Sequence, residues 1–254
     1  MPEILAVVNQ KGGVGKTTTC INLSASLSKT TRKVLLVDLD PQSNATRGCG
    51  ADPHGLSTSI NDLLLERSSA DETVIQPDNI DFSLLPATPD LTEAEVMLIS
   101  SEHKEYTLKK ILSTLNTEYD YIIIDCPPSL NILTVNALSA ASGVLIPVQC
   151  EFFALQGLSE LITTIDTIKN SSNKDLTIKG IVRTMFDPRN NLATDVSAQL
   201  LKFFDDKVYR TIIPRNITLA EAPSHGMPVI NYDKGSKGAL SYLSLVGEII
   251  KQER

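Results

Sequence analysis

The chain has 254 residues, of which 42% are hydrophobic and 21% charged, and its formal net charge is −7. This length and composition suit a globular α/β protein, most simply one domain over residues 1–254, and no apolar run approaches the ~18 residues of a membrane span. There is no signal-like N-terminal segment and no C-x-x-C pair among the four cysteines, so export, a zinc site and a disulfide framework are disfavoured and we expect a cytoplasmic protein.

Apolar, β-branched runs alternate with helical patterns along the chain. The runs predict strands at 4–8, 34–37, 82–85, 121–124, 144–148 and 178–182, with a short one near Val229, and the periodic segments predict helices at 16–29, 58–65, 91–115, 132–140, 155–169, 192–204 and 238–251. The polar stretch 66–79 is interpreted as an exposed loop. Strands alternating with helices predict right-handed βαβ units, and therefore a mostly parallel, twisted sheet with helices on both faces.

A glycine-rich segment follows the first predicted strand and opens the first predicted helix. A strand, loop and helix in this order are what a nucleotide phosphate site requires. The glycines let backbone N–H groups face phosphate oxygens, and the helix N-terminus adds roughly half a positive charge. Lys16 is placed to reach the β- and γ-phosphates, and the Thr17 hydroxyl to ligate Mg²⁺. The predicted phosphate-binding residues are Lys11, Gly12, Gly13, Val14, Gly15, Lys16, Thr17 and Thr18.

The loop departs from the usual G-x-x-x-x-G-K-[ST] pattern at its start. Gln10 occupies the position of the first glycine, and a second lysine, Lys11, follows it. Because Lys16 already serves the phosphates of its own protomer, the cation of Lys11 has no evident role there.

Acidic residues end two of the predicted strands. Asp38 and Asp40 follow the run 34–37, and Asp125 follows the run 121–124. Ligands of such sheets bind at the carboxyl ends of the strands, so these carboxylates are expected beside the phosphate loop. There they suit contact with Mg²⁺, directly or through water, and the orientation or deprotonation of an attacking water.

Several motifs together resemble those of a known family. The loop, residues 37–42 (Val-Asp-Leu-Asp-Pro-Gln) and residues 123–128 (Ile-Ile-Asp-Cys-Pro-Pro) resemble the deviant Walker A P-loop ATPases, to which MinD is related. Residues 9–11, 40–45, 211–216 and 219–226 narrow the resemblance to the ParA/Soj chromosome- and plasmid-partitioning ATPases. It covers residues 3 to about 250 and implies a P-loop NTPase fold. With no DNA-binding extension before the first strand, the chain looks like the short, chromosomal type.

The resemblance implies roles for the nucleotide-site residues. It implies a slow, Mg²⁺-dependent ATPase that forms an ATP-bound sandwich homodimer, in which Lys11 reaches the partner's nucleotide. Lys16 and Thr17 would contact phosphate and Mg²⁺, and Asp40 the catalytic water. Asp125 would lie near the metal, with Asp38 supporting the metal-bound waters. The loops near Met185 and Pro214 would line the adenine base.

The resemblance also implies two macromolecular partners and a nucleoid-associated location. The ATP-bound dimer would bind double-stranded DNA without sequence preference, and a ParB-type centromere-binding protein would stimulate hydrolysis. Charge is compatible with this, since residues 179–254 carry 11 Lys and Arg against 8 Asp and Glu, whereas residues 1–178 carry 12 against 22. The candidate DNA contacts are Arg189 and Arg215, with Lys202, Lys207 and Arg210 as further candidates.

Three alternatives remain from the sequence. A MinD-like membrane-positioning ATPase would end in a basic amphipathic helix, but residues 248–254 contain few cations, so we expect no membrane partner. A metabolic relative that forms amide bonds or carboxylates a small molecule would need a substrate pocket. A scaffold that binds ATP without hydrolysis is disfavoured by Asp40 and Lys11. The three histidines are unclustered, so no metal is indicated beyond nucleotide-bound Mg²⁺.

Overall fold

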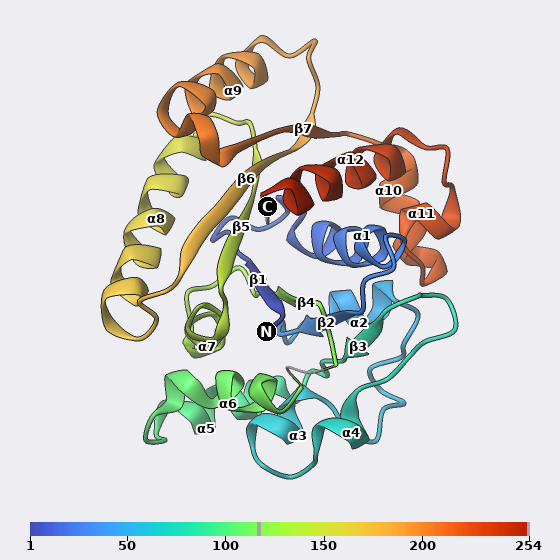
Figure 1. The fold of residues 1–254 in the computed structure, drawn as a ribbon, viewed down its shortest axis with the longest axis vertical. Helices are drawn as coiled ribbons and strands as arrows, with labels where there is room; N and C mark the ends of the chain where they lie inside the picture. The colour runs from blue at the N-terminus through green and yellow to red at the C-terminus, as the bar shows by residue number, and fades with distance from the viewer. Residues whose placement is uncertain (116–117, 253–254) are drawn as a thin grey trace.

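A single parallel sheet organises the described part of the chain. The computed structural model describes residues 1–115 and 118–252. Within them, seven strands form one sheet in the order β3-β2-β4-β1-β5-β6-β7, and all neighbouring strands are parallel. Helices lie on both faces of the sheet (Figure 1). The predicted fold class is confirmed. The strands are β1 (Glu3–Val7), β2 (Val34–Asp38), β3 (Ser83–Leu85), β4 (Tyr121–Asp125), β5 (Gly143–Gln149), β6 (Thr177–Phe186) and β7 (Val208–Pro214).

The central strands are apolar along their whole length because each face of the sheet packs on its own core. Successive side chains point to opposite faces, so Leu5 and Ile123 join one core while Ala6 and Ile122 join the other. The first face carries α1 (Lys16–Ser28), α2 (Asn44–Gly48), α10 (Ile217–Glu221), α11 (Val229–Tyr232) and α12 (Lys237–Lys251). The second carries α3 (Ile60–Leu64), α5 (Leu91–Ile99), α6 (Thr107–Thr114), α7 (Ile132–Ala140), α8 (Ala154–Ser171) and α9 (Asn191–Phe204).

The prediction of a strand near Val229 is wrong. Those residues form α11, in which the Val229 N–H donates to the buried side chain of Asn22 on α1. The seventh strand is instead β7, which the sequence reading missed. Its residues mix buried, intermediate and exposed positions, with Tyr209 buried and Arg210 exposed, as expected for an edge strand, and so lack the continuous apolar run of the central strands.

The prediction of one helix over 91–115 is also wrong. The segment contains α5, a 3₁₀ turn (Lys104–Tyr106) and α6. The break falls where His103 adopts a left-handed conformation, with φ of 54°, which an α-helix cannot accommodate. The predicted loop 66–79 likewise contains a short helix, α4 (Ala70–Thr73), and a bridge from Ile75 to Leu84.

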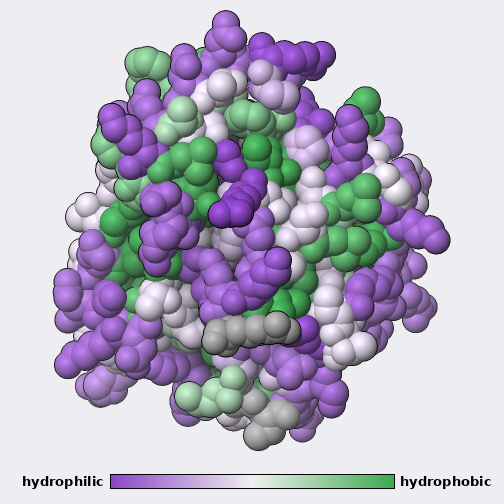
Figure 2. Space-filling model, turned by 45° about the horizontal axis from the view of Figure 1, so that its top comes forward, coloured by the Kyte–Doolittle hydropathy of each residue, from purple (hydrophilic) through white to green (hydrophobic). Residues whose placement is uncertain are grey.

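No helix in the described ranges is long and apolar enough to cross a bilayer. On the face shown in Figure 2, hydrophobic residues form separate clusters among hydrophilic ones.

Strand register brings the sequence-predicted acidic residues together. In the ladders of β2, β4 and β1, Asp38 pairs with Asp125, and Asp125 pairs with Val7. The three strands therefore end at one level, and the glycine-rich loop leaves the sheet from that same edge. The fold places both motifs at the carboxyl edge of the sheet, where ligands of this architecture bind.

Candidate nucleotide site

The glycine-rich loop has the backbone conformation of an anion-binding turn. Gly13 and Gly15 have φ of 75° and 87°, in the left-handed region that favours glycine. Within the described residues, the backbone N–H groups of Gly12 to Gly15 donate to no protein acceptor. Gly15 is the N-cap of α1. Unpaired N–H groups at the start of a 13-residue helix form a site for an anion such as a phosphate.

Lys16 lies beneath this loop with its charge largely removed from solvent. The residue is 8% exposed, and its Nζ lies 3.4 Å from the Lys11 carbonyl oxygen, a long contact for a hydrogen bond. A buried ammonium is costly unless an anion pairs with it. Its position at the first turn of α1, beside the unpaired N–H groups, therefore suits a bound phosphate.

Asp125 is fully buried at the end of β4 and incompletely satisfied. The Cys20 thiol donates to Oδ1 over 3.4 Å, and the nearby Thr17 hydroxyl acts to lower the pKa of the carboxyl group. No donor in the described residues reaches Oδ2. Burial, followed by repulsion from Asp38, raises the pKa of Asp125 well above its usual range. Buried, closely spaced carboxylates with an unpaired oxygen fit a divalent cation, which would offset both effects.

Asp38 is also fully buried, but its oxygens are engaged. Oδ2 accepts hydrogen bonds from the Thr46 backbone N–H (2.8 Å) and hydroxyl (2.7 Å), and Oδ1 accepts from the Asp40 N–H at 3.2 Å. Burial raises its pKa, while the bonds from Thr46 lower it. Asp38 thus fastens α2 and the segment of Asp40 to the end of β2, next to Asp125.

Asp40 begins the turn that leads into α2. It is 8% exposed, and Oδ1 accepts the Gln42 N–H at 2.9 Å. The Ser43 N–H donates to its carbonyl oxygen. Within the described part of the chain, no protein group donates a hydrogen bond to the other carboxylate oxygen, Oδ2, which can therefore accept one from water.

Lys11 is paired within its own protomer. Its ammonium forms an ion pair with Glu151, which follows β5, and the two side chains are 44% and 45% exposed. Two hydrogen bonds hold the start of the loop. The Lys11 N–H donates to the Asn9 side chain, and the Asn9 side chain donates to the Pro147 carbonyl oxygen. The pair lies at the surface of the carboxyl edge, so Lys11 is accessible to a second molecule.

A small cavity adjoins the phosphate loop on the side of β6 and β7. It has a volume of about 150 Å³ and is bordered by Gly15 and Thr18 of the loop and α1. Met185 and Pro214, predicted to line the adenine base, both border it. Met185 has φ of 48°, an uncommon conformation for a side chain of this size. The remaining lining comes from Thr184, Ile213, Arg215, Asn216, Leu219, Ala220 and Tyr242.

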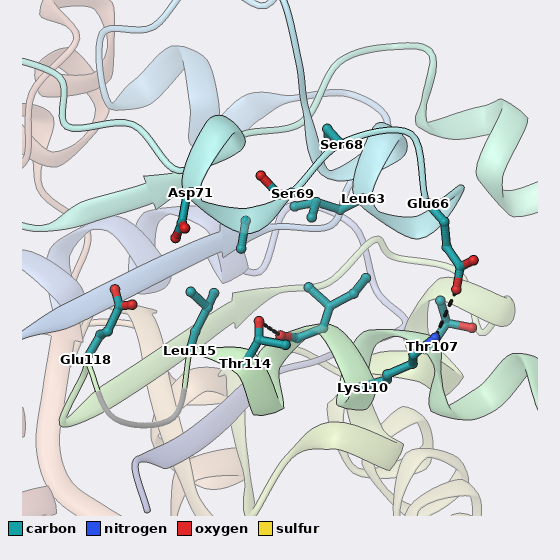
Figure 3. A pocket seen from close by; sticks show the side chains of 12 residues that line it. Leu63, Glu66, Ser68, Ser69, Asp71, Thr107, Lys110, Thr114, Leu115 and Glu118 are labelled. Carbon is teal, nitrogen blue, oxygen red and sulfur yellow. Dashed lines mark hydrogen bonds and ion pairs between the residues drawn. The ribbon is translucent and has the colours of Figure 1, made fainter.

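A larger cavity of about 500 Å³ lies elsewhere, between α4 and α6. Figure 3 shows the Asp71 and Glu118 carboxylates at one end and the Glu66–Lys110 ion pair at the other. Because Lys110 is already paired and the other charges are acidic, this cavity would repel phosphate groups. It is therefore not a candidate for the nucleotide.

Two of the predicted DNA contacts lie at the carboxyl edge. Arg189, in the loop after β6, is exposed and forms a bidentate ion pair with Asp187, at 2.9 Å from Nε to Oδ1 and 2.7 Å from Nη2 to Oδ2. The hydrogen bonds from Arg189 lower the pKa of Asp187 to about 2. Phe186 and Pro214 pair in the ladder of β6 and β7, so Arg189 and Arg215 both follow the ends of neighbouring strands. They are brought to one surface.

The other predicted DNA contacts lie at the opposite end of β7. Lys207 precedes β7 and Arg210 is its third residue, whereas Arg215 follows its last. A seven-residue strand spans about 20 Å, so these cations form a separate group. Lys202, in the last turn of α9, is exposed, and Lys207 pairs with Asp206 at 3.6 Å.

Two residues at this edge were missed by the sequence reading. Glu151 pairs with Lys11, and the Thr184 hydroxyl donates to the Val14 carbonyl oxygen at 2.8 Å. The contacts join residues 140 and 170 positions apart. No local pattern identifies either residue, because each gains its role only through contact with the loop.

The parallel sheet, the phosphate loop and the strand-end carboxylates define a P-loop nucleotide-binding protein. Comparisons with known proteins narrow this class. The profile of a family described as an AAA domain matches residues 2–178. A chromosome partitioning protein ParA from Myxococcus xanthus is 49% identical over 252 residues, covering 99% of this chain and 89% of that protein. The sporulation initiation inhibitor protein Soj from Bacillus subtilis is 47% identical over 249 residues, covering 98% of each.

A solved structure extends the comparison to bound nucleotide. Cobyrinic acid a,c-diamide synthase from Mycobacterium smegmatis, with a bound ATP analogue and magnesium, has a TM-score of 0.88 at 36% identity, and the match covers 100% of this chain and 96% of that one. The chain belongs to the AAA-domain family and to the ParA/Soj chromosome-partitioning ATPases. The resemblance found in the sequence motifs is confirmed.

Proposed function

We propose that this chain is a slow, Mg²⁺-dependent ATPase in DNA segregation, whose ATP-bound form dimerises and binds DNA without sequence preference. One observation carries the proposal. The carboxyl edge of the sheet gathers a phosphate-binding loop, a buried lysine and buried carboxylates, and it leaves a second lysine, Lys11, accessible at the surface. We further propose that the described residues act as one P-loop ATPase domain.

Different residues at this edge contact different parts of ATP. The N–H groups of Gly12 to Gly15 and the ammonium of Lys16 bind the phosphates, while Met185 and Pro214 lie against the base. Thr17 and Asp125 hold Mg²⁺, which supplies positive charge to the phosphates when bound. Asp38 supports these residues indirectly, because its carboxylate accepts the Asp40 N–H and so holds the segment that contains Asp40.

Asp40 is the group that acts on the attacking water. Its carboxylate starts the turn after β2 and keeps one oxygen without a protein donor, so it can accept a hydrogen bond from water and orient it toward the terminal phosphate. Slow turnover is consistent with a site in which Lys11 of the same protomer is directed away, toward Glu151.

Lys11 links nucleotide binding to dimerisation. In the free protomer its ammonium is held by an exposed ion pair worth little, about 0.2–1 kcal/mol. The terminal phosphates of a partner protomer's ATP carry more charge than one carboxylate and lie in a drier setting. Lys11 therefore exchanges Glu151 for the partner's phosphates when two ATP-bound protomers meet, and hydrolysis weakens that contact.

DNA binding follows from dimerisation. Each protomer offers Arg189 and Arg215 at the carboxyl edge, with Lys202 on α9 and Lys207 and Arg210 toward the start of β7. A monomer with so few phosphate contacts binds weakly, whereas a dimer doubles them. A ParB-type partner that stimulates hydrolysis would thus release the protein from the nucleoid. This partner is supported by family membership.

The decisive experiment measures binding to a random-sequence DNA duplex with ATP, with ADP and without nucleotide, over a salt series. Wild type is compared with Arg189→Glu and with Arg67→Glu, a matched control whose arginine also forms an exposed bidentate pair, with Glu93. We expect salt-sensitive binding with ATP alone, lost in Arg189→Glu and kept in Arg67→Glu. Absence of DNA binding by ATP-bound wild type would refute the proposal.

A metabolic enzyme is the second candidate. The similarity to the cobyrinic acid a,c-diamide synthase structure, at 36% identity over the whole chain, favours it. The test is ATP turnover with cobyrinic acid and a nitrogen donor, with the product analysed by mass. Amide formation without DNA binding would favour this candidate over the partitioning one. Vesicle co-sedimentation with ATP tests the MinD-like alternative in the same way.

A further inference from the structure

A buried hydrogen bond connects the phosphate loop, which follows β1, to a different strand, β6. The Thr184 hydroxyl, near the end of β6, donates to the Val14 carbonyl oxygen at 2.8 Å, and the two residues are 2% and 1% exposed. In the sheet, β5 lies between β6 and the strand that precedes the loop, β1. The loop therefore reaches over the end of β5 to make this contact.

The Thr184–Val14 hydrogen bond also fixes the direction of the Gly15 N–H, because the peptide bond between Val14 and Gly15 is planar. In a planar, trans peptide, the carbonyl of one residue and the N–H of the next point in opposite directions. With the Val14 oxygen held toward Thr184, the Gly15 N–H must point away from β6. No acceptor in the described residues takes this N–H. It is thus left to face the concave side of the loop.

The surroundings favour a rigid contact. A Cβ atom built on Gly15 would lie 3.7 Å from Met185 Cε and 4.0 Å from Thr184 Cβ, so the end of β6 packs directly on the loop. Met185 holds a left-handed conformation there. The same two residues of β6 border the small cavity beside the loop. The segment therefore joins the cavity proposed for the base to the loop proposed for the phosphates.

We propose that Thr184 is a positioning residue for a nucleoside diphosphate group: its hydroxyl fixes the Val14–Gly15 peptide so that the Gly15 N–H is aimed at the β-phosphate before nucleotide binds. The inference rests on the proposed nucleotide site and adds a residue to it. Without the hydroxyl, the peptide is free to rotate, and ordering it becomes a cost of binding. Because the Thr184 hydroxyl is engaged by the Val14 carbonyl oxygen, its effect acts through the loop.

The test compares Thr184→Val, which removes the donor while keeping the shape, with wild type. We expect ADP to bind about five- to thirtyfold more weakly, while the affinity for AMP, which lacks the β-phosphate, changes less than threefold. KM for ATP should rise more than kcat falls. Equal weakening of ADP and AMP would indicate a general structural role and overturn the inference, as would an unchanged Kd for ADP.

Two controls keep the test decisive. Thr73→Val removes another buried hydroxyl that donates to a backbone carbonyl, that of Ser69, and should leave ADP affinity unchanged. If Thr184→Val does not fold, Thr184→Ser and Thr184→Cys replace it, since they are similar in size but the thiol is a weak donor. Ser should retain ADP affinity and Cys should lose it, and equal affinities would overturn the inference. Failure of wild type to bind ADP would instead refute the proposed nucleotide site.

Discussion

The buried charges of the nucleotide site and the exposed arginine Arg189 near them use charge in opposite ways. At the edge, Lys16, Asp38 and Asp125 are at most 8% exposed, and defined hydrogen bonds hold most of their polar atoms. Arg189, by contrast, is 88% exposed in its side chain and paired with a carboxylate two residues away. A buried charge requires a particular ligand, whereas an exposed cation accepts any phosphate at a suitable spacing.

Arginines illustrate the difference within one strand and its loop. Arg183, on β6, is 5% exposed and donates to the Ser197 hydroxyl and to two backbone carbonyl oxygens of β7. Arg189, six residues later, contacts only Asp187 in the described residues. A count of basic residues in the C-terminal third therefore overstates the charge available to DNA.

The largest effect is expected at the buried edge, from Asp40→Ala. Loss of the group that orients the attacking water should reduce kcat by about 10²- to 10⁴-fold, while ATP binding and the ATP-dependent dimer persist. Steady-state turnover and the sedimentation of the ATP-bound protein measure the two properties. Asp52→Ala is the matched control, because Asp52 accepts the His54 N–H as Asp40 accepts that of Gln42. Turnover of Asp40→Ala at the wild-type rate would contradict the assignment.

At the same edge, Lys16→Ala should impair ATP binding itself, whereas Asp40→Ala should impair only hydrolysis. Removing the ammonium beneath the loop is expected to weaken ATP binding by about 10²-fold or more and to abolish nucleotide-dependent dimerisation. Calorimetric titration with ATP and sedimentation measure these effects. Lys29→Ala removes an exposed lysine just after α1, paired with Asp81, and should change neither. Tight ATP binding by Lys16→Ala would show that the loop binds phosphate without it.

The two arginines should respond differently to the same change. Arg183→Ala leaves buried acceptors on β7 unpaired, so the free energy of unfolding should fall by about 2–4 kcal/mol. Arg189→Ala should alter it by less than about 0.5 kcal/mol and act on DNA affinity instead. Denaturant unfolding and DNA binding on both variants provide the comparison. A large loss of stability in Arg189→Ala would remove the distinction between the buried and the exposed arginine.

The smallest effect is expected from Glu151→Gln. If Glu151 competes with the partner's phosphates for Lys11, its neutralisation should strengthen the ATP-dependent dimer about two- to tenfold, because two exposed ion pairs are released per dimer. In the Lys11→Ala background the same change should have no effect. An equal effect in both backgrounds would mean that Glu151 acts independently of Lys11.

Much of the nucleotide site could be predicted because its residues follow local rules. The glycines at 13 and 15 need a left-handed backbone, and Asp38 and Asp125 end continuous apolar strands. β7 escaped prediction because Arg210 and Thr211 interrupt its apolar residues, so this edge strand has no such run. The break at His103 was missed for a related reason, since helical periodicity continues on both sides of it.

The sequence by itself determined the fold class, the phosphate loop and the identity of the acidic residues beside it, because strand periodicity, glycine conformation and strand-end position are properties of short segments. Only the tertiary structure decided which residues from distant parts of the chain contact these segments. Glu151 reaches Lys11, Thr184 reaches Val14, and Arg183 is buried while Arg189 is exposed. These outcomes depend on strand order and register, which no short segment encodes and which, for Lys11 and Val14, bring together residues more than a hundred positions apart.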